Sequence, residues 1–190
     1  MGQGLHSKMI AIASHELGIR PERIRLKNTR TDKVPNTSAT AASSGTDLNG
    51  AAISNACQQL VERLRKNAAK IFQTPVDEQA QISFDNGFCI APNGQRIPIE
   101  DVINRTYADR ESLAATGYYA PPGIKYDAVT GRGVPFAYYA YGVCVLEIEV
   151  CTLTGEYKLV DVEVLNDAGD ALLPNIDIGQ VEGAFVQGYG

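Results

Sequence analysis

Apolar residues recur at helical spacing in two stretches near the start of the chain. In residues 5–17 they fall on one face, and Gly18 follows as a natural C-cap. In residues 43–71 they repeat every four positions from Leu48 to Leu64, and small hydroxyl and acidic residues crowd the start, where capping groups belong. The pattern predicts a short helix, then a long one whose stripe from Leu48 to Leu64 is core.

Between these helices the periodicity is lost. Residues 24–27 have the pattern of a short strand. Residues 28–42 are rich in Thr, Ser, Asn and Ala and follow no period, which is typical of a loop. Very small residues, 34–46, run into the start of the long helix.

The middle of the chain carries hairpin signals. Residues 81–84 and 88–91 flank a turn of Asp85, Asn86 and Gly87, which predicts a β-hairpin. A short helix is predicted over residues 99–107, with Pro98 near its start. Residues 117–135, rich in Tyr, Pro and Gly, are predicted to have little regular structure.

The last third alternates apolar and polar side chains. Residues 138–151 and 158–166 predict a long antiparallel hairpin, with Glu147 and Glu149 facing solvent. Residues 175–190 predict a closing helix in which two glycines four apart allow close backbone approach. Three valines of the returning strand are predicted to face inside: Val160, Val162 and Val164. Hairpins packed with long helices indicate an α+β fold.

Composition and charge narrow the class of protein. The 190 residues carry 17 Lys+Arg against 22 Asp+Glu, a net charge of −5, and 44% are hydrophobic. These values are ordinary for a globular domain and argue against nucleic-acid binding, which prefers a basic surface. No apolar run is long enough to span a membrane. We therefore expect neither a nucleic acid nor a membrane as partner.

The cysteines follow no metal-ligand or disulfide spacing. Cys144 and Cys151 lie an odd number of residues apart on one predicted strand, so they are expected to face opposite sides and not to pair. Together with Cys57 and Cys89 they are predicted to be reduced and buried, in a cytoplasmic protein. With only two histidines, a histidine-based metal site is not expected.

Three segments have residues suited to binding an anion or a polar ring. Gly2, Gln3 and Gly4 directly precede the first helix, where backbone N–H groups are available; the alternative is a flexible chain start. Residues 34–46 leave the start of the long helix uncovered; the alternative is an ordinary capped loop. Gln180 lies in a Gly-rich apolar helix, where the alternative is a solvated face.

Taken in order, these segments resemble the molybdenum-binding large subunit of bacterial xanthine dehydrogenases, in the molybdenum hydroxylase (xanthine oxidase) family. Residues 1–6, 34–43 and 176–183 resemble the three cofactor loops of that family, and the resemblance extends to 117–119, 135–142 and 153–156. It departs from the common pattern around Ala168 and at 172–175.

The resemblance implies part of a molybdopterin-binding domain within a longer enzyme. Its subdivision would be cofactor loops and long helix (1–72), hairpin and connection (73–135), and long hairpin with closing helix (136–190). The molybdenum–molybdopterin cofactor would contact Met1, Gly2, Gln3, Thr40, Ala41, Ala42, Ser43 and Gln180, with Ala42 beside the metal.

The implied activity is hydroxylation of xanthine or hypoxanthine with oxygen from water. [2Fe–2S] clusters, FAD and NAD would be bound outside this segment, by other domains or a partner subunit of an oligomeric enzyme. The family's general base is a glutamate in a Gly-Glu-Pro-Pro-like segment, which does not occur here, so no catalytic residue is assigned and the fragment alone is expected to be inactive. Two alternatives remain open: an aldehyde-type or other aromatic-heterocycle hydroxylase, and a module that is cofactor-free in isolation.

Overall fold

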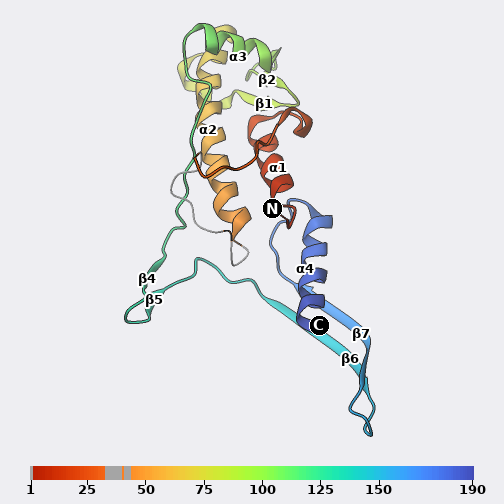
Figure 1. The fold of residues 1–190 in the computed structure, drawn as a ribbon. Coiled ribbons are helices and arrows are strands. Elements are labelled where there is room, and N and C mark those ends of the chain that lie inside the picture. Colours follow the sequence, from red (N-terminus) through yellow and green to blue (C-terminus); the bar gives the residue numbers. More distant parts are fainter. Residues whose placement is uncertain (1, 33–39, 41–43) are drawn as a thin grey trace. The chain divides into compact units, whose positions relative to one another are not determined.

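The computed structural model describes residues 2–32, 40 and 44–190. They form two compact units, Met1–Ala120 and Pro121–Gly190. Figure 1 shows helices and a small sheet in the first unit, and paired strands with a helix in the second. Among the described residues, no helix combines the length and the apolar character needed to cross a membrane.

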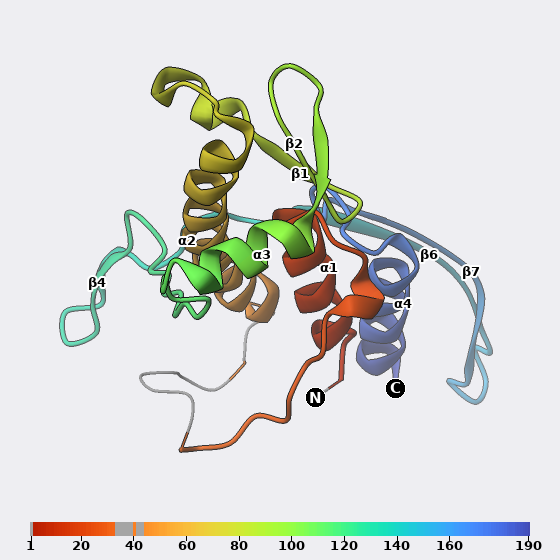
Figure 2. The same cartoon turned by 90° about the horizontal axis from the view of Figure 1, so that it is seen from above.

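In the first unit, α1 (Leu5–Leu17) and α2 (Gly45–Phe72) lie side by side and run in the same direction. Figures 1 and 2 show the two helices from the side and from above. Both helices were predicted from apolar periodicity, and both predictions are confirmed. Residue numbers rise together along both helices at their contacts, as expected for a parallel pair: Leu5 contacts Gly45, Ile12 contacts Gly50, and Glu16 contacts Ser54.

The carboxyl end of α1 packs against the hairpin turn at residues 85–87, and a glycine makes this close contact possible. Gly18 adopts φ 61°, in the left-handed region that favours glycine, and caps the helix as predicted. A Cβ on Gly18 would lie 2.2 Å from the carbonyl oxygen of Phe84, so a side chain does not fit there. Gly87 N–H donates to the Gly18 carbonyl at 2.7 Å, which ties the hairpin turn to the end of the helix.

A three-stranded antiparallel sheet and the second half of α2 enclose the core. The strands are β1 (Ser83–Asp85), β2 (Phe88–Ile90) and β3 (Arg96–Pro98), followed by α3 (Ile99–Ala108). The predicted hairpin and short helix are confirmed, and β3 is an addition. The core cluster consists of Leu64, Ala68, Ala69, Phe72, Ile82, Cys89, Ala91 and Val102.

Two expectations for the first unit need correction. Residues 24–27 follow the 3-10 turn η1 (Pro21–Arg23) but form no strand, because no neighbouring strand in the described part of the chain pairs with them. The stripe of α2 is fully buried only at Leu64, while Leu48 and Leu60 are half-buried. The reason is that the core lies against the carboxyl-terminal half of α2, where the 3-10 segment η2 (Val76–Gln81) also packs.

The second unit is built from two hairpins and a helix. β4 (Lys125–Asp127) pairs with β5 (Arg132–Val134), inside the stretch predicted to be largely irregular. β6 (Gly142–Val150) pairs with β7 (Tyr157–Asn166), and α4 (Pro174–Tyr189) ends the chain. The long hairpin and the closing helix are therefore confirmed.

The prediction that the valines of β7 face the inside of the protein is wrong. Val160 and Val164 are 47% and 43% exposed, and Val162 is half-buried. A two-stranded ribbon has too few neighbours to cover its faces, and a register irregularity near Ile148 interrupts the pairing. Glu147 and Glu149 are exposed, as predicted.

The cysteines divide into two pairs by burial. Cys57 and Cys89 are buried as predicted, whereas Cys144 and Cys151 are exposed on the ribbon, which corrects the expectation for those two. All four are free thiols. Burial raises the pKa of Cys89 to about 11, although the nearby Arg65 charge lowers it in part. Hydrogen bonds from Thr154 and from the backbone of Leu153 lower the pKa of Cys151 below its ordinary value.

We expect a short pulse of iodoacetamide near neutral pH to label Cys151 and to leave Cys89 unmodified. The thiolate is the reactive form, so the Cys151 rate should reach its half-maximum at a lower pH than that of an ordinary thiol. Peptide mass mapping measures both sites, and Cys144→Ser removes the other exposed thiol as a control. Equal labelling of Cys89 in the folded chain would contradict this prediction.

Candidate functional site

The starts of the two parallel helices meet in the first unit. Gly45 is buried, and a Cβ on it would lie 2.8 Å from Thr40 Cγ2 and 3.2 Å from Leu5 Cδ2. Leu5 opens α1 and Gly45 opens α2, so both amino ends lie at the same place. The first-turn N–H groups of a helix lack intrahelical acceptors and carry partial positive charge. Two such ends together favour an anionic group.

The loop before α1 is a tight turn with an exposed surface. Gln3 and Gly4 adopt φ 62° and 63°, both left-handed, and Leu5 N–H donates to the Gly2 carbonyl at 3.3 Å. Gly2 and Gln3 are exposed, and among the described residues no atom lies within 4 Å of a Cβ built on Gly2. The backbone at Gly2 and the Gln3 amide are therefore accessible to a ligand.

Asp47 is the acidic residue in the first turn of α2. Desolvation by burial raises the pKa of its carboxyl group above the ordinary value.

The third predicted segment lies in the second unit, on α4. Pro174 occupies the first turn of this helix, and Gln180 and Glu182 are exposed. No described atom lies within 4 Å of a Cβ built on Gly179 or Gly183. The close backbone approach expected at these glycines is therefore not made by the described residues, and this helix face is open.

The predicted contact residues have the following places. Gly2, Gln3 and Thr40 belong to the first unit, and Gln180 belongs to the second. Met1, Ala41, Ala42 and Ser43 lie outside the described residues. Gly45 lies within the predicted segment 34–46 but was not singled out there; its signal was its place directly after two serines at the start of a long helix.

The available donors fit a large polar anion carrying ring or phosphate groups. They comprise backbone N–H groups, the Gln3 amide, the Thr40 hydroxyl and exposed glycine backbone. Within the part of the chain that the structure describes, no three His, Cys, Asp or Glu side chains gather as ligands for a bare metal ion. A pterin cofactor with a phosphate matches this donor set, since backbone amides and helix starts bind phosphate.

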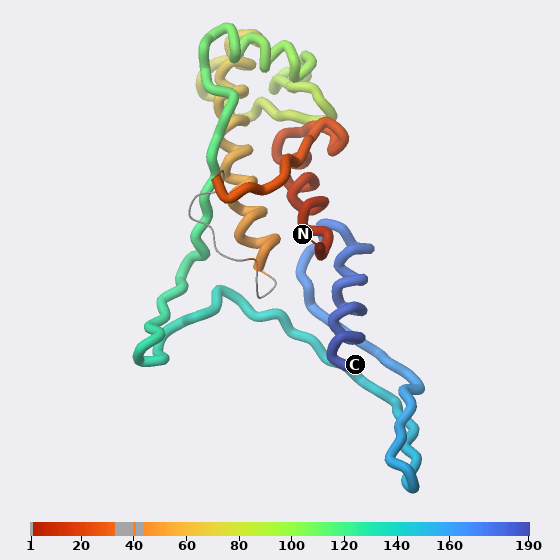
Figure 3. The backbone as a smooth tube through the Cα atoms, viewed as in Figure 1, coloured from red at the N-terminus to blue at the C-terminus, as the bar shows by residue number. Residues whose placement is uncertain are grey.

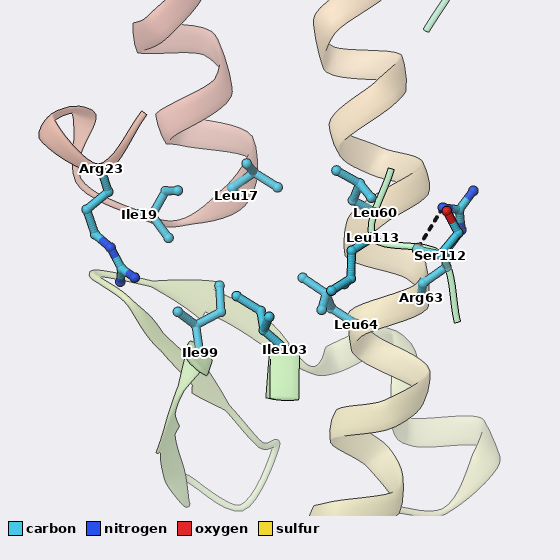
Figure 4. Close-up of a pocket in the computed structure, with 10 residues that line it drawn as sticks. All are labelled: Leu17, Ile19, Arg23, Leu60, Arg63, Leu64, Ile99, Ile103, Ser112 and Leu113. Atoms are coloured by element: carbon cyan, nitrogen blue, oxygen red, sulfur yellow. Dashed lines mark hydrogen bonds between the residues drawn. The ribbon is translucent and has the colours of Figure 1, made fainter. Parts of the chain in front are cut away.

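A different hollow lies beside the core of the first unit. It has a volume of about 190 Å³ and a mainly apolar lining that includes Leu17, Leu60 and Ile103 (Figure 4). Arg23 at its edge is paired with Glu100 at 2.7 Å. It is lined from the carboxyl end of α1 and the middle of α2, so it is separate from the helix starts.

Two parallel helices whose amino ends meet, the first preceded by a glycine-containing turn, are suited to binding an anionic organic cofactor. The family model described as "Molybdopterin cofactor-binding domain" matches residues 1–190. The chain belongs to this family, so the predicted molybdenum–molybdopterin cofactor and the α+β fold are confirmed.

Proteins of known name are similar in sequence to this chain along its whole length. It is 42% identical over 190 residues to xanthine dehydrogenase/oxidase of Gallus gallus and 43% identical over 190 residues to that of Felis catus. It is 43% identical over 191 residues to xanthine dehydrogenase of Drosophila pseudoobscura pseudoobscura. Each alignment covers 100% of this chain and 12% of the relative, so the chain spans about one eighth of their length.

Solved structures share the fold. A Cu,Mo-CO dehydrogenase in its carbon monoxide reduced state has a TM-score of 0.76 and 24% identity, over 96% of this chain and 22% of the other. A reconstituted CO dehydrogenase from Oligotropha carboxidovorans has a TM-score of 0.77 and 23% identity, with the same coverage. At this level of identity the match establishes the architecture alone.

Proposed function

We propose that these residues supply cofactor contacts to a molybdenum hydroxylase that oxidises xanthine or hypoxanthine with oxygen from water. The observation that carries this proposal is the identity of 42–43% over the full chain to proteins named xanthine dehydrogenase. The meeting of Leu5, Thr40 and Gly45 supports it independently, since it provides an anion site at two of the three segments that resemble cofactor loops.

Each described contact residue has a role that its chemistry permits. By resemblance, the Gln180 amide hydrogen-bonds the cofactor. Gly2 lets the pterin approach the backbone, and the Gln3 amide donates and accepts hydrogen bonds at the ring edge. Thr40 and the starts of α1 and α2 hold the phosphate. By resemblance, Met1, Ala41, Ala42 and Ser43 complete these contacts, and the small side chain of Ala42 leaves room beside the metal.

When bound, the molybdenum–pterin group supplies the redox and oxygen-transfer chemistry, while the protein supplies binding and orientation. We assign no proton-transfer residue in this chain. The exposed ribbon carboxylates Glu147 and Glu149 face solvent and have no motif match to the family's base, so that base is proposed to come from another segment.

Further proposals follow from the same resemblance. Electrons would leave through [2Fe–2S] clusters to FAD and NAD, held by other domains or a partner subunit. The intact enzyme would be cytoplasmic and oligomeric, with residues 1–190 as one part of its molybdenum domain, divided at 72 and 135 as the sequence predicts.

Gln180→Ala is expected to weaken cofactor retention about tenfold or more. A hydrogen bond to a charged partner contributes about 1.5–3 kcal/mol, and about 1.4 kcal/mol is a factor of ten. The measurement is molybdenum and pterin per protein in the natural polypeptide that contains these residues. Gln187→Ala, an exposed glutamine on the same helix, is the matched control. Wild-type retention and turnover in Gln180→Ala would count against the assigned role.

Substrate assays separate the remaining possibilities. Xanthine-dependent dye reduction by the purified natural polypeptide is the expected result. Reduction with an aldehyde but not with xanthine would instead assign the chain to an aldehyde-type hydroxylase. A preparation with neither molybdenum nor pterin would overturn the proposal and leave a structural module.

A further inference from the structure

An extended segment, residues 112–118, lies along α2 and is called here the clamp segment. It follows α3, and as its residue numbers rise its partners on α2 fall towards the amino end of that helix (Figure 3). Arg63 Nη1 donates to the carbonyls of Ser112 and Ala114 at 2.9 and 2.7 Å. Figure 4 shows the first of these bonds.

The contact continues one helical turn at a time. Gln59 Nε2 donates to the Thr116 carbonyl at 3.2 Å, and Tyr118 N–H donates to Asn55 Oδ1 at 3.4 Å. Gln59 also donates to Asn55 Oδ1 at 3.0 Å, which links the two positions. Asn55, Gln59 and Arg63 are four residues apart, so they share one face of α2. These side chains bind mainly backbone groups of the clamp segment.

Gly117 brings the two backbones into direct contact. A Cβ at this position would lie 1.8 Å from the Ala52 carbonyl oxygen and 2.8 Å from Ala56 N. The carbonyl belongs to the helix backbone and cannot rotate away as a side chain would. Even alanine at position 117 must therefore move the clamp segment off the helix.

The clamp segment contacts the part of α2 that precedes the core cluster, a part that α1 also supports. The core cluster contacts α2 only from Leu64 onward, whereas Leu48, Ala52 and Ala56 are half-buried. Among the described residues of the first unit, two segments contact the amino-terminal half of α2. One is α1, at Gly45 and Gly50, and the other is the clamp segment. This half begins at the helix start assigned above to the cofactor's phosphate.

We propose that the clamp segment holds the amino-terminal half of α2 in position for the cofactor, with Gly117 and Arg63 as positioning residues. The inference rests on the proposed function. Neither residue contacts the cofactor; both act through the helix, because a binding group must be held close to its productive geometry to retain affinity. Loss of the clamp is therefore expected to lower cofactor occupancy while the core stays folded.

The test uses the natural polypeptide with Gly117→Ala, Arg63→Ala and Arg63→Lys. Two readouts are combined: molybdenum and pterin per protein, and hydrogen–deuterium exchange of residues 44–56. We expect exchange there to rise roughly 5- to 30-fold, the range that one or two kcal/mol of lost stabilisation represents. The molybdenum content is expected to fall in parallel, and the lysine variant should recover part of both effects because it retains a charged donor.

Matched controls separate positioning from general destabilisation. Lys66→Ala removes an exposed cation from the same helix, where it pairs only with Glu62 among its described ion pairs. Gly188→Ala adds a methyl group to a helical glycine with open space around it. Both are expected to keep wild-type occupancy and exchange.

The possible outcomes separate a failure of this inference from a failure of the proposed function on which it rests. Suppose that the wild type carries molybdenum, that the Gly117 and Arg63 variants carry as much, and that exchange at 44–56 is unchanged. The proposed role of the clamp segment would then be overturned, and the proposed function would stand. If exchange rises only within 112–118, the clamp is likewise overturned. If the wild type itself carries no pterin, the proposed function fails first. If Gly117→Ala does not fold, the comparison of Arg63→Ala with Arg63→Lys tests the role of the clamp segment.

Discussion

Replacing Ile82 with alanine is expected to destabilise the first unit by about 2–5 kcal/mol. Ile82 is 1% exposed and lies in the core cluster with Leu64 and Phe72 of α2. Its carbonyl also accepts a hydrogen bond from Arg65 Nε at 3.0 Å, so its backbone is tied to the helix and has little freedom to close the cavity. Urea unfolding of the chain, followed by circular dichroism, measures the loss.

A matched substitution shows whether burial is the cause. Val76 lies in η2, five residues before the end of that segment, and is 84% exposed. Val76→Ala should change the free energy of unfolding by about 0.5 kcal/mol or less, as is usual for surface positions. A similar loss from both variants would mean that the cluster around Ile82 is not the stabilising core.

Gly45→Leu is expected to remove most of the cofactor from the natural polypeptide. A Cβ at position 45 already approaches Thr40 Cγ2 to 2.8 Å and Leu5 Cδ2 to 3.2 Å, and leucine adds three more carbons. The starts of α1 and α2 must then separate, so their N–H groups no longer converge on one anion. Such overpacking costs about 1–3 kcal/mol, less than the usual total stability of a domain. Elemental molybdenum and the fluorescence of oxidised pterin measure the occupancy.

Asn49→Leu is the control, because Asn49 is exposed on the same helix one turn further on. It places the same leucine side chain at an exposed position, outside the contact between the helix starts, and it should retain the cofactor. Full occupancy in Gly45→Leu, with the variant folded, would show that the meeting of the two helix starts is not needed for binding.

Local patterns in the sequence predicted most of the elements. The helical spacing in residues 5–17 and 43–71, and the turn at Asn86 and Gly87, are each set by neighbours along the chain, and all three appear in the structure. β3, β4 and β5 were missed because strands of three residues are too short to display a period; β1 and β2 are equally short and were found from the turn that joins them. Residues 24–27 were mispredicted because a strand requires a partner that the local sequence does not reveal.

Burial and position depend on residues far away in the chain. The valines of β7 have the pattern of an inward face, but the second unit as described provides too little surface to cover them. Likewise, Gln59 and Thr116 are 57 residues apart, and nothing in either local sequence indicates that they bind each other.

By itself, the sequence determined the helices, the main turns, the net negative charge and the resemblance of three segments to cofactor loops, because each depends on residue type and local spacing. Only the tertiary structure decided that α1 and α2 run in the same direction, that Leu5, Thr40 and Gly45 meet, and that the clamp segment lies on α2. Those features arise from close packing between distant residues, where the presence or absence of a single Cβ at Gly45 or Gly117 sets how closely two segments approach.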